Sequence, residues 1–273
     1  KLVVSDESFQ LTHRAYEKPA DYLGGDLFQE YLKRTVPKYT EDMLAGLGYA
    51  ITGQTAALYV PPNYDETQDF GVYVEVTAGG RGRVPGRDHQ DVFEKHKLIY
   101  ICPHGAGNKA VLSYRMGLAL DALVTVKRHY RIDPKRCYVG GVSGGGISST
   151  MIGYLRPEFF KGSVNIVRGA LLENYKLEKA VKVRGTQGYA AGQIYPPFLP
   201  HLAGKHRKIS QRYQDKRWAF VSGENDFNYE FAKVSGPQWT KHGYQAKYFH
   251  VPGMGHSQAS GKTLDEVFTW MEM

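Results

Sequence analysis

The chain has 273 residues, of which 42% are hydrophobic and 13% are aromatic. This suits one large α/β domain, because no repeat, low-complexity tract or Ser/Pro-rich linker divides the chain. No apolar run approaches the roughly 20 residues that cross a bilayer, so we expect no membrane span. The formal net charge of +8 is dispersed, and no nucleic-acid-binding motif accompanies it. We interpret the charge as a contribution to solubility, with an anionic partner such as an acidic polysaccharide as the alternative.

The first fifty residues carry the weakest pattern. Short helices are expected over residues 20–34 and 41–47, where apolar side chains recur at helical spacing. We interpret residues 1–55 as an N-terminal extension that packs on a main domain spanning residues 56–273.

The main domain opens with three apolar runs that predict strands. They lie at residues 56–60, 70–76 and 97–102, and we expect the first of them to begin the sheet. A charged loop is expected over residues 81–88, before the third strand.

From residue 109 onward, helical and strand patterns alternate. The expected strands are residues 137–142, 162–167, 217–222 and 245–251, and the expected helices are residues 109–130, 144–149 and 230–242. Thr263 and Glu266 form a capping box, so we expect the terminal helix to open at Thr263. Residues 171–216 are weakly periodic and are expected to form a cap or rim over a pocket.

This alternation of strands and helices predicts the α/β class, with a mostly parallel sheet and helices on both faces. Ligands in such sheets bind beyond the carboxyl ends of the strands. Candidate functional residues are therefore those that directly follow a strand.

Residues 141–145 fit the G-x-S-x-G nucleophile elbow, with Ser143 at the centre. A Gly-rich turn is the alternative in a chain with 31 glycines. An apolar run enters the turn like a buried strand and a small-residue run leaves it like a close-packed helix, which is the context that the motif requires. Gly141 and Gly145 are small because the turn is too tight for side chains. We therefore predict that Ser143 is a nucleophile.

A serine hydroxyl needs a histidine base near neutral pH, and the base needs an acid that orients it. Folds that carry this elbow present them in the order serine, acid, histidine. His256 lies in the loop after the last expected strand and is the predicted base. The other histidines after Ser143 fall in the expected cap, helix or strand: His201, His206, His242 and His250.

The predicted acid is Asp226, which follows the strand at residues 217–222. Glu224 is the competing carboxylate, and an Asx turn is the structural alternative.

The oxyanion hole needs two backbone N–H groups, one from the residue after the nucleophile and one from the loop after the third strand. Gly144 supplies the first. Residues 103–107 mimic a lipase motif, but a single helix separates the strand before them from the elbow strand, so that strand is the fourth. The second donor is then expected in the turn after residues 70–76, with Gly79 preferred and Ala78 as the alternate.

Three residues that follow the fourth strand are interpreted as turn residues, with a place at the pocket edge as the alternative: His104, Gly105 and Asn108.

The two cysteines, Cys102 and Cys137, fall on strands that this order separates by a third strand. That is about twice the roughly 4.8 Å strand spacing and exceeds the reach of a disulfide. We expect two free, buried thiols.

Residues 59–64, residues 132–146 and the loops of Asp226 and His256 together resemble the α/β-hydrolase superfamily. Within it they are most similar to secreted esterases related to feruloyl esterases, acetylxylan esterases and polyhydroxyalkanoate depolymerases. The resemblance covers residues 56–273 and implies the α/β-hydrolase fold and a secreted or periplasmic location. Such relatives often carry His-Gly where this chain has Thr77 and Ala78.

The leading hypothesis is a serine carboxylic-ester hydrolase that forms an acyl-enzyme and needs no metal or organic cofactor. Its expected partner is a small-molecule or polymeric ester of a carbohydrate, an aromatic acid or a polyester, and the oligomeric state is open. The alternatives are a serine peptidase of the same fold and a catalytically silent binding module.

Overall fold

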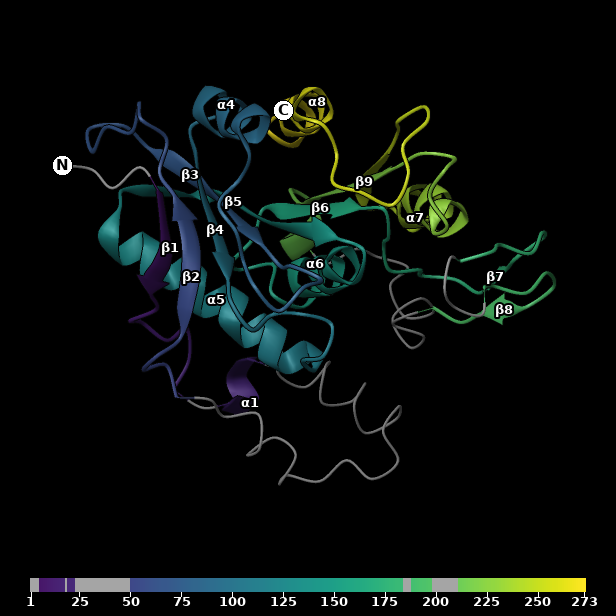
Figure 1. Ribbon diagram of the computed structural model, residues 1–273, viewed down its shortest axis with the longest axis horizontal. Helices are drawn as coiled ribbons and strands as arrows, with labels where there is room; N and C mark the ends of the chain where they lie inside the picture. Colours follow the sequence, from purple (N-terminus) through teal and green to yellow (C-terminus); the bar gives the residue numbers. More distant parts are fainter. Residues whose placement is uncertain (1–4, 18, 23–49, 184–187, 198–210) are drawn as a thin grey trace.

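The computed structural model describes residues 5–17, 19–22, 50–183, 188–197 and 211–273. Its centre is an eight-stranded sheet in the order β1-β2-β4-β3-β5-β6-β9-β10 (Figure 1). These strands are β1 (Ser5–Gln10), β2 (Thr55–Tyr59), β3 (Phe70–Glu75), β4 (Leu98–Pro103), β5 (Ile132–Val142), β6 (Gly162–Ile166), β9 (Arg217–Ser222) and β10 (Gln245–His250). Strand β2 runs antiparallel to β1 and β4, and the other neighbours are parallel. The predicted mostly parallel sheet is confirmed.

The sheet begins earlier than expected, because β1 pairs with β2 as an edge strand. Its residues are mostly polar and exposed, so it lacks the apolar run from which the other strands were predicted. Residues 23–49 lie outside the described residues, and with them most of the helix expected at residues 20–34 and all of the one at 41–47. The described helix α1 (Pro19–Tyr22) contacts α5 (Leu112–His129).

Helices cover both faces of the sheet (Figure 1). Helices α4 (Arg87–Lys95) and α8 (Gly261–Met271) pack together on one face. On the other face lie α5, α6 (Gly144–Leu155) and α7 (Tyr229–Lys241). The short strands β7 (Tyr175–Lys176) and β8 (Ile194–Tyr195) form a separate hairpin on the α7 side. No helix among the described residues is long and apolar enough to span a bilayer.

Two local features differ from expectation. The charged stretch expected as a loop over residues 81–88 is a loop as far as Gly86, but its last two residues begin α4, a helix that was not predicted and whose only buried side chains are Val92 and Phe93. So narrow an apolar face gives little periodic signal. The terminal helix begins at Gly261, two residues before Thr263, because Ser260 is the N-cap and its Oγ accepts a hydrogen bond from the Thr263 backbone N–H at 3.3 Å.

The strand order confirms the prediction for the cysteines. Cys102 on β4 and Cys137 on β5 are separated by β3, and both are buried and free.

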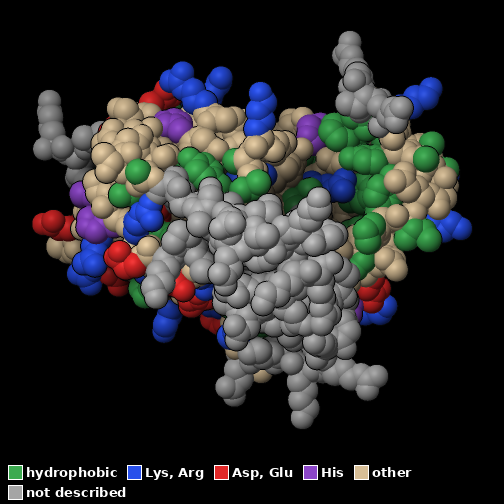
Figure 2. Space-filling model, turned by 90° about the horizontal axis from the view of Figure 1, so that it is seen from below, with side chains coloured by type: hydrophobic (Ala, Val, Ile, Leu, Met, Phe, Trp, Pro, Cys, Tyr) green, Lys and Arg blue, Asp and Glu red, His purple; other side chains and the backbone are tan. Residues whose placement is uncertain are grey.

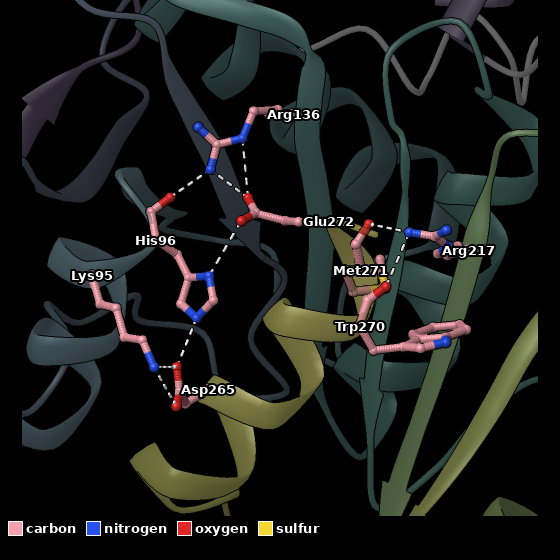
Figure 3. Close-up of polar contacts among 8 residues, drawn as sticks. All are labelled: Lys95, His96, Arg136, Arg217, Asp265, Trp270, Met271 and Glu272. Carbon is pink, nitrogen blue, oxygen red and sulfur yellow. Dashed lines mark hydrogen bonds and ion pairs between the residues drawn. The ribbon is translucent and has the colours of Figure 1, made fainter.

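A polar network fixes α8 at the amino ends of the strands (Figure 3). His96, which caps the C-terminus of α4, lies 2.8 Å from Asp265 Oδ1 through Nε2 and 3.3 Å from Glu272 Oε2 through Nδ1. Arg136 donates to the same Glu272 carboxylate from β5. Arg217 on β9 donates to the last carbonyl oxygens of α8. The carboxyl ends of the strands lie at the opposite edge of the sheet, where loops follow them.

Candidate active site

Ser143 lies on a strained turn between β5 and α6. Its φ of 58° and ψ of −118° are unusual for a residue with a side chain, and such conformations cost on the order of 1–3 kcal/mol. A Cβ on Gly141 or Gly145 would collide with the carbonyl oxygen of Val76 at the end of β3. The turn is held because the Ser143 N–H donates to the Ile166 carbonyl oxygen at 2.9 Å. The predicted strand, turn and helix are thus present.

His256 and Asp226 meet at this same edge of the sheet. Nδ1 of His256 lies 2.8 Å from Oδ1 of Asp226. The buried Asp226 carboxylate also accepts hydrogen bonds from Ser222 Oγ at 2.9 Å and from the Asn228 N–H at 3.1 Å. Three donors around one carboxylate fix its position, and Nδ1–H donation to it leaves Nε2 of the histidine as a proton acceptor.

The competing carboxylate, Glu224, makes different contacts. Its Oε1 accepts a hydrogen bond from the Gly253 N–H at 2.8 Å, and Oε2 lies 3.5 Å from His250 Nε2. Hydrogen bonds from its own backbone N–H and from the Gly253 N–H lower the pKa of Glu224. The side chain therefore fixes the turn before His256, and it forms no hydrogen bond or ion pair with His256 in the described structure.

Phe227, which sequence reasoning missed, stacks on the imidazole of His256. The ring centroids are 4.0 Å apart and the planes are inclined by 25°. The side chain of His256 is 29% exposed, so the phenyl ring covers one face of an otherwise accessible ring. The sequence signal for this role was that Phe227 directly follows the predicted acid, Asp226.

The described residues contain no hydrogen bond between Ser143 Oγ and His256. Such a bond is often long in the absence of substrate and tightens when substrate binds. The loops after β5, β9 and β10 nonetheless bring all three predicted residues to one edge of the sheet.

The turn after β3 approaches the elbow closely. The Gly79 N–H donates to Thr77 Oγ1 at 3.1 Å, within its own turn. The Ala78 N lies 3.6 Å from the position that a Cβ on Gly145 would take, and it has no hydrogen-bond acceptor among the described residues. Gly144 is the first residue of α6, so its N–H lacks an intrahelical partner.

The turn after β4 supports these loops. His104 Nδ1 accepts a hydrogen bond from the Gly82 N–H at 3.0 Å, and Nε2 lies 2.8 Å from the Glu7 carbonyl oxygen. Gly105 has a φ of 79°, which suits a glycine turn. The Asn108 side chain lies directly against Gly144. His104 and Gly105 thus have turn roles, whereas Asn108 borders the elbow.

Arg115 on α5 joins two of the loops and was not singled out from the sequence. Its Nε donates to the Ala106 carbonyl oxygen at 2.7 Å and its Nη2 donates to the Thr77 carbonyl oxygen at 3.0 Å. Burial lowers the pKa of its guanidinium to about 10. The side chain thus ties the turn that contains Ala78 to α5.

A pocket of about 530 Å³ lies behind that turn, lined by Glu75, Thr77, Gly79, Arg83 and Gln258 among others. Burial raises the pKa of Glu75 to about 7. No group of three or more His, Cys, Asp or Glu side chains in the described part of the chain is arranged to hold a metal ion.

No protein-family model matches the sequence, and a search of curated proteins finds no match. Solved structures do match. They include an esterase from Pyrobaculum calidifontis (TM-score 0.55, 14% identity, 80% of this chain and 81% of that one). Est1E from Butyrivibrio proteoclasticus has a TM-score of 0.53 at 14% identity, over 81% of this chain and 96% of that one. The carboxylesterase EstE1 from a metagenomic library has a TM-score of 0.52 at 14% identity, over 89% and 94%. With the strand order, these likenesses show the α/β-hydrolase fold.

Proposed function

We propose that this α/β-hydrolase chain is a serine carboxylic-ester hydrolase. The observation that carries the proposal is the 2.8 Å contact between His256 Nδ1 and Asp226 Oδ1, at the sheet edge where Ser143 is held in a strained elbow. A strained conformation persists only where the surroundings enforce it, and it is typical of functional positions. The esterases among the solved structures of this fold add support.

In the proposed reaction, Ser143 Oγ attacks the acyl carbon of the ester while Nε2 of His256 takes its proton. The tetrahedral intermediate collapses, the bond to the alcohol oxygen breaks, and His256 returns the proton to that oxygen. Water then attacks the acyl-enzyme by the same route and releases the acid. Asp226 keeps the proton of His256 on Nδ1 and stabilises the imidazolium that forms.

For the oxyanion, we propose the N–H groups of Gly144 and Ala78. The Gly79 N–H is engaged by Thr77 Oγ1, and an engaged donor would have to break that bond to serve the oxyanion. The Ala78 N–H is the better candidate because its nitrogen lies close to Gly145 of the elbow and has no acceptor among the described residues. Of the two donors predicted from the sequence, we therefore prefer Ala78, the alternate, to Gly79.

The proposed substrates are esters of an aromatic acid, a carbohydrate or a polyester. Aromatic rings gather around Phe231 beside the site, with the ring centroids of Tyr195, Tyr189 and Tyr175 at 4.8, 5.0 and 5.9 Å. Phe231 itself is buried, and the partly exposed tyrosine rings around it suit stacking on a planar acyl group or a sugar face. Est1E has been solved with ferulic acid bound, which makes feruloyl esters a first choice for assay.

The test is hydrolysis of 4-nitrophenyl acetate, methyl ferulate and acetylated xylan by the wild type and by Ser143→Ala. A fluorophosphonate probe should label the wild type at Ser143, and the variant should lose both labelling and turnover by several orders of magnitude. Near-wild-type turnover in the variant would refute the nucleophile. An absence of both labelling and turnover in the wild type would favour a silent binding module.

A further inference from the structure

Arg168 lies beside the elbow, just past the end of β6. It follows by two residues Ile166, whose carbonyl oxygen accepts the Ser143 N–H. Its own carbonyl oxygen packs so closely on Gly146, in the first turn of α6, that a Cβ there would collide with it. The backbone of Arg168 is therefore fixed relative to the nucleophile.

The guanidinium of Arg168 is held between the loop of Asp226 and the β7–β8 hairpin. Nη1 donates to Asn228 Oδ1 at 2.8 Å and to the Tyr189 hydroxyl at 3.3 Å. Its central carbon lies 3.9 Å from the centroid of the Phe231 ring. The Asn228 N–H donates to Asp226, so Asn228 links this cation to the acid that contacts His256.

This cation has no ion-pair partner among the described residues. Burial lowers the pKa of Arg168, and the Tyr189 hydroxyl and the more distant charge of Asp226 offset that effect only in part. A desolvated charge is costly unless an opposite charge or hydrogen bonds compensate it. The site is thus electrostatically prepared for an anion.

The guanidinium also keeps donors available. In the described structure all its hydrogen bonds come from Nη1, which leaves Nε and Nη2 for a ligand. Two neighbouring N–H donors match the two oxygens of a carboxylate, a geometry that lysine does not offer. The side chain is only partly buried, so a ligand can reach it.

The surroundings of the guanidinium are aromatic. Phe231, Tyr189 and Tyr195 pack edge to face on one another, and the guanidinium lies over the rings of Phe231 and Tyr189. On the side of the molecule where β7 and β8 lie, Figure 2 shows hydrophobic side chains gathered with Lys and Arg side chains among them. Phe231 is buried, whereas Tyr189 and Tyr195 are partly exposed, so a ligand at Arg168 would meet the tyrosine rings and one fixed cation.

We propose that Arg168 binds a carboxylate carried by the substrate, so that the enzyme prefers esters with a free carboxylate over matched neutral esters. This rests on the proposed ester hydrolysis and adds a substrate class to it. The carboxylate forms a bidentate contact with Nε and Nη2, while Nη1 keeps its bonds to Asn228 and Tyr189. Carboxylates of an acyl group and of an alcohol group share this chemistry.

The kinetic test uses two matched pairs of substrates. Mono-4-nitrophenyl glutarate and its methyl ester place the carboxylate on the acyl side, and 4-carboxyphenyl acetate and its methyl ester place it on the leaving side. We expect the wild type to favour the anionic member of one pair in kcat/KM. Arg168→Gln should reduce that preference by about 10- to 100-fold, mainly through KM, because a charge-assisted hydrogen bond is lost. Arg168→Lys should restore only part of it.

Arg128→Gln is the matched control. It removes the same charge from an exposed position at the C-terminal end of α5, toward the opposite edge of the sheet, and should leave the preference unchanged. An equal loss for both members of each pair in Arg168→Gln would overturn the proposal, since it would assign Arg168 to positioning Asn228 alone.

Binding separates this proposal from the hydrolysis itself. In Ser143→Ala, cinnamate should bind more tightly than cinnamamide, and Arg168→Gln added to that variant should remove the difference. Equal binding of acid and amide refutes the carboxylate site even if esters are hydrolysed. Preferential binding of cinnamate in a protein that turns over no ester supports the carboxylate site and refutes the proposed function instead.

Discussion

The side-chain amide of Gln258 donates a hydrogen bond to Glu75 Oε2 at 3.3 Å. Glu75 is the last residue of β3, three positions before Ala78, and Gln258 lies two positions after His256. This contact joins the turn proposed to bind the oxyanion to the loop of the proposed base. Two parts of the site that are 183 residues apart in sequence are thus held by a carboxyl group that titrates near neutral pH.

Glu75 should make the protein less stable as the pH rises toward neutrality. Burial raises its pKa to about 7 in the folded protein, so between about pH 4.5 and 7 the folded state binds more protons than the unfolded state. The free energy of unfolding should therefore fall across this window, by at most about 3 kcal/mol. Glu75→Gln should abolish that contribution and be the more stable protein at pH 7.5.

Urea unfolding at pH 4.5, 6.0 and 7.5 measures this effect. Glu66→Gln removes an exposed carboxylate and serves as the control. An unchanged pH dependence in Glu75→Gln would show that the pKa of Glu75 is the same in the folded and the unfolded protein.

The two acids near His256 should respond differently to the same chemical change. Asp226→Asn places an amide where His256 Nδ1–H needs an acceptor and favours the wrong tautomer, so turnover should fall by up to about 10⁴-fold. Glu224→Gln keeps an oxygen for the Gly253 N–H and should change turnover by little. Steady-state kinetics with one activated ester measures both turnover numbers. A large loss of turnover in the Glu224 variant, with an active Asp226 variant, would assign the acid to Glu224 instead.

Phe227 should act as a positioning residue for His256. Removing the stacked ring in Phe227→Ala frees the imidazole to rotate, and an aromatic pair is worth about 0.5–1.5 kcal/mol, which corresponds to roughly 2- to 10-fold in kcat. Phe227→Tyr retains the stack and should behave like the wild type. A change confined to KM, or an equal change in both variants, would indicate contact with substrate instead.

His96 should stabilise the fold at low pH. Desolvation lowers its pKa, but the hydrogen bonds to Glu272 and Asp265 and their charges outweigh this and raise it. The stabilisation is therefore fully present below about pH 6.5, the pKa of an unperturbed histidine, and is lost as the pH rises through the raised value. His96→Asn should be destabilised by about 1–3 kcal/mol at pH 5.5, because buried hydrogen bonds are lost.

Thermal or urea unfolding of His96→Asn and the wild type at pH 5.5 and 8.5 measures this contribution. The gap between the two proteins should narrow at pH 8.5. A gap that stays constant would mean that His96 packs as a neutral ring.

Much of the fold and the members of the candidate site could be predicted from the sequence because the signals are local. The turn around Ser143 needs two small neighbours, and Asp226 and His256 each follow a buried strand. Strand β1 was not predicted because an exposed edge strand need not be apolar. Helix α4 was not predicted because only two of its side chains are buried. Phe227, Arg168 and the pair of Glu75 and Gln258 acquire their roles from contacts between distant loops, which spacing does not reveal.

The network of His96, Arg136, Asp265 and Glu272 (Figure 3) has a practical consequence for engineering. It lies toward the amino ends of the strands, whereas the elbow follows the carboxyl end of β5, seven residues after Arg136. Substitutions at distant sites without shared partners usually add in their effects on stability. Tighter ion pairs there should therefore raise the melting temperature independently of changes made around Arg168 to alter substrate choice, so that thermostability and selectivity can be optimised in separate libraries and then combined.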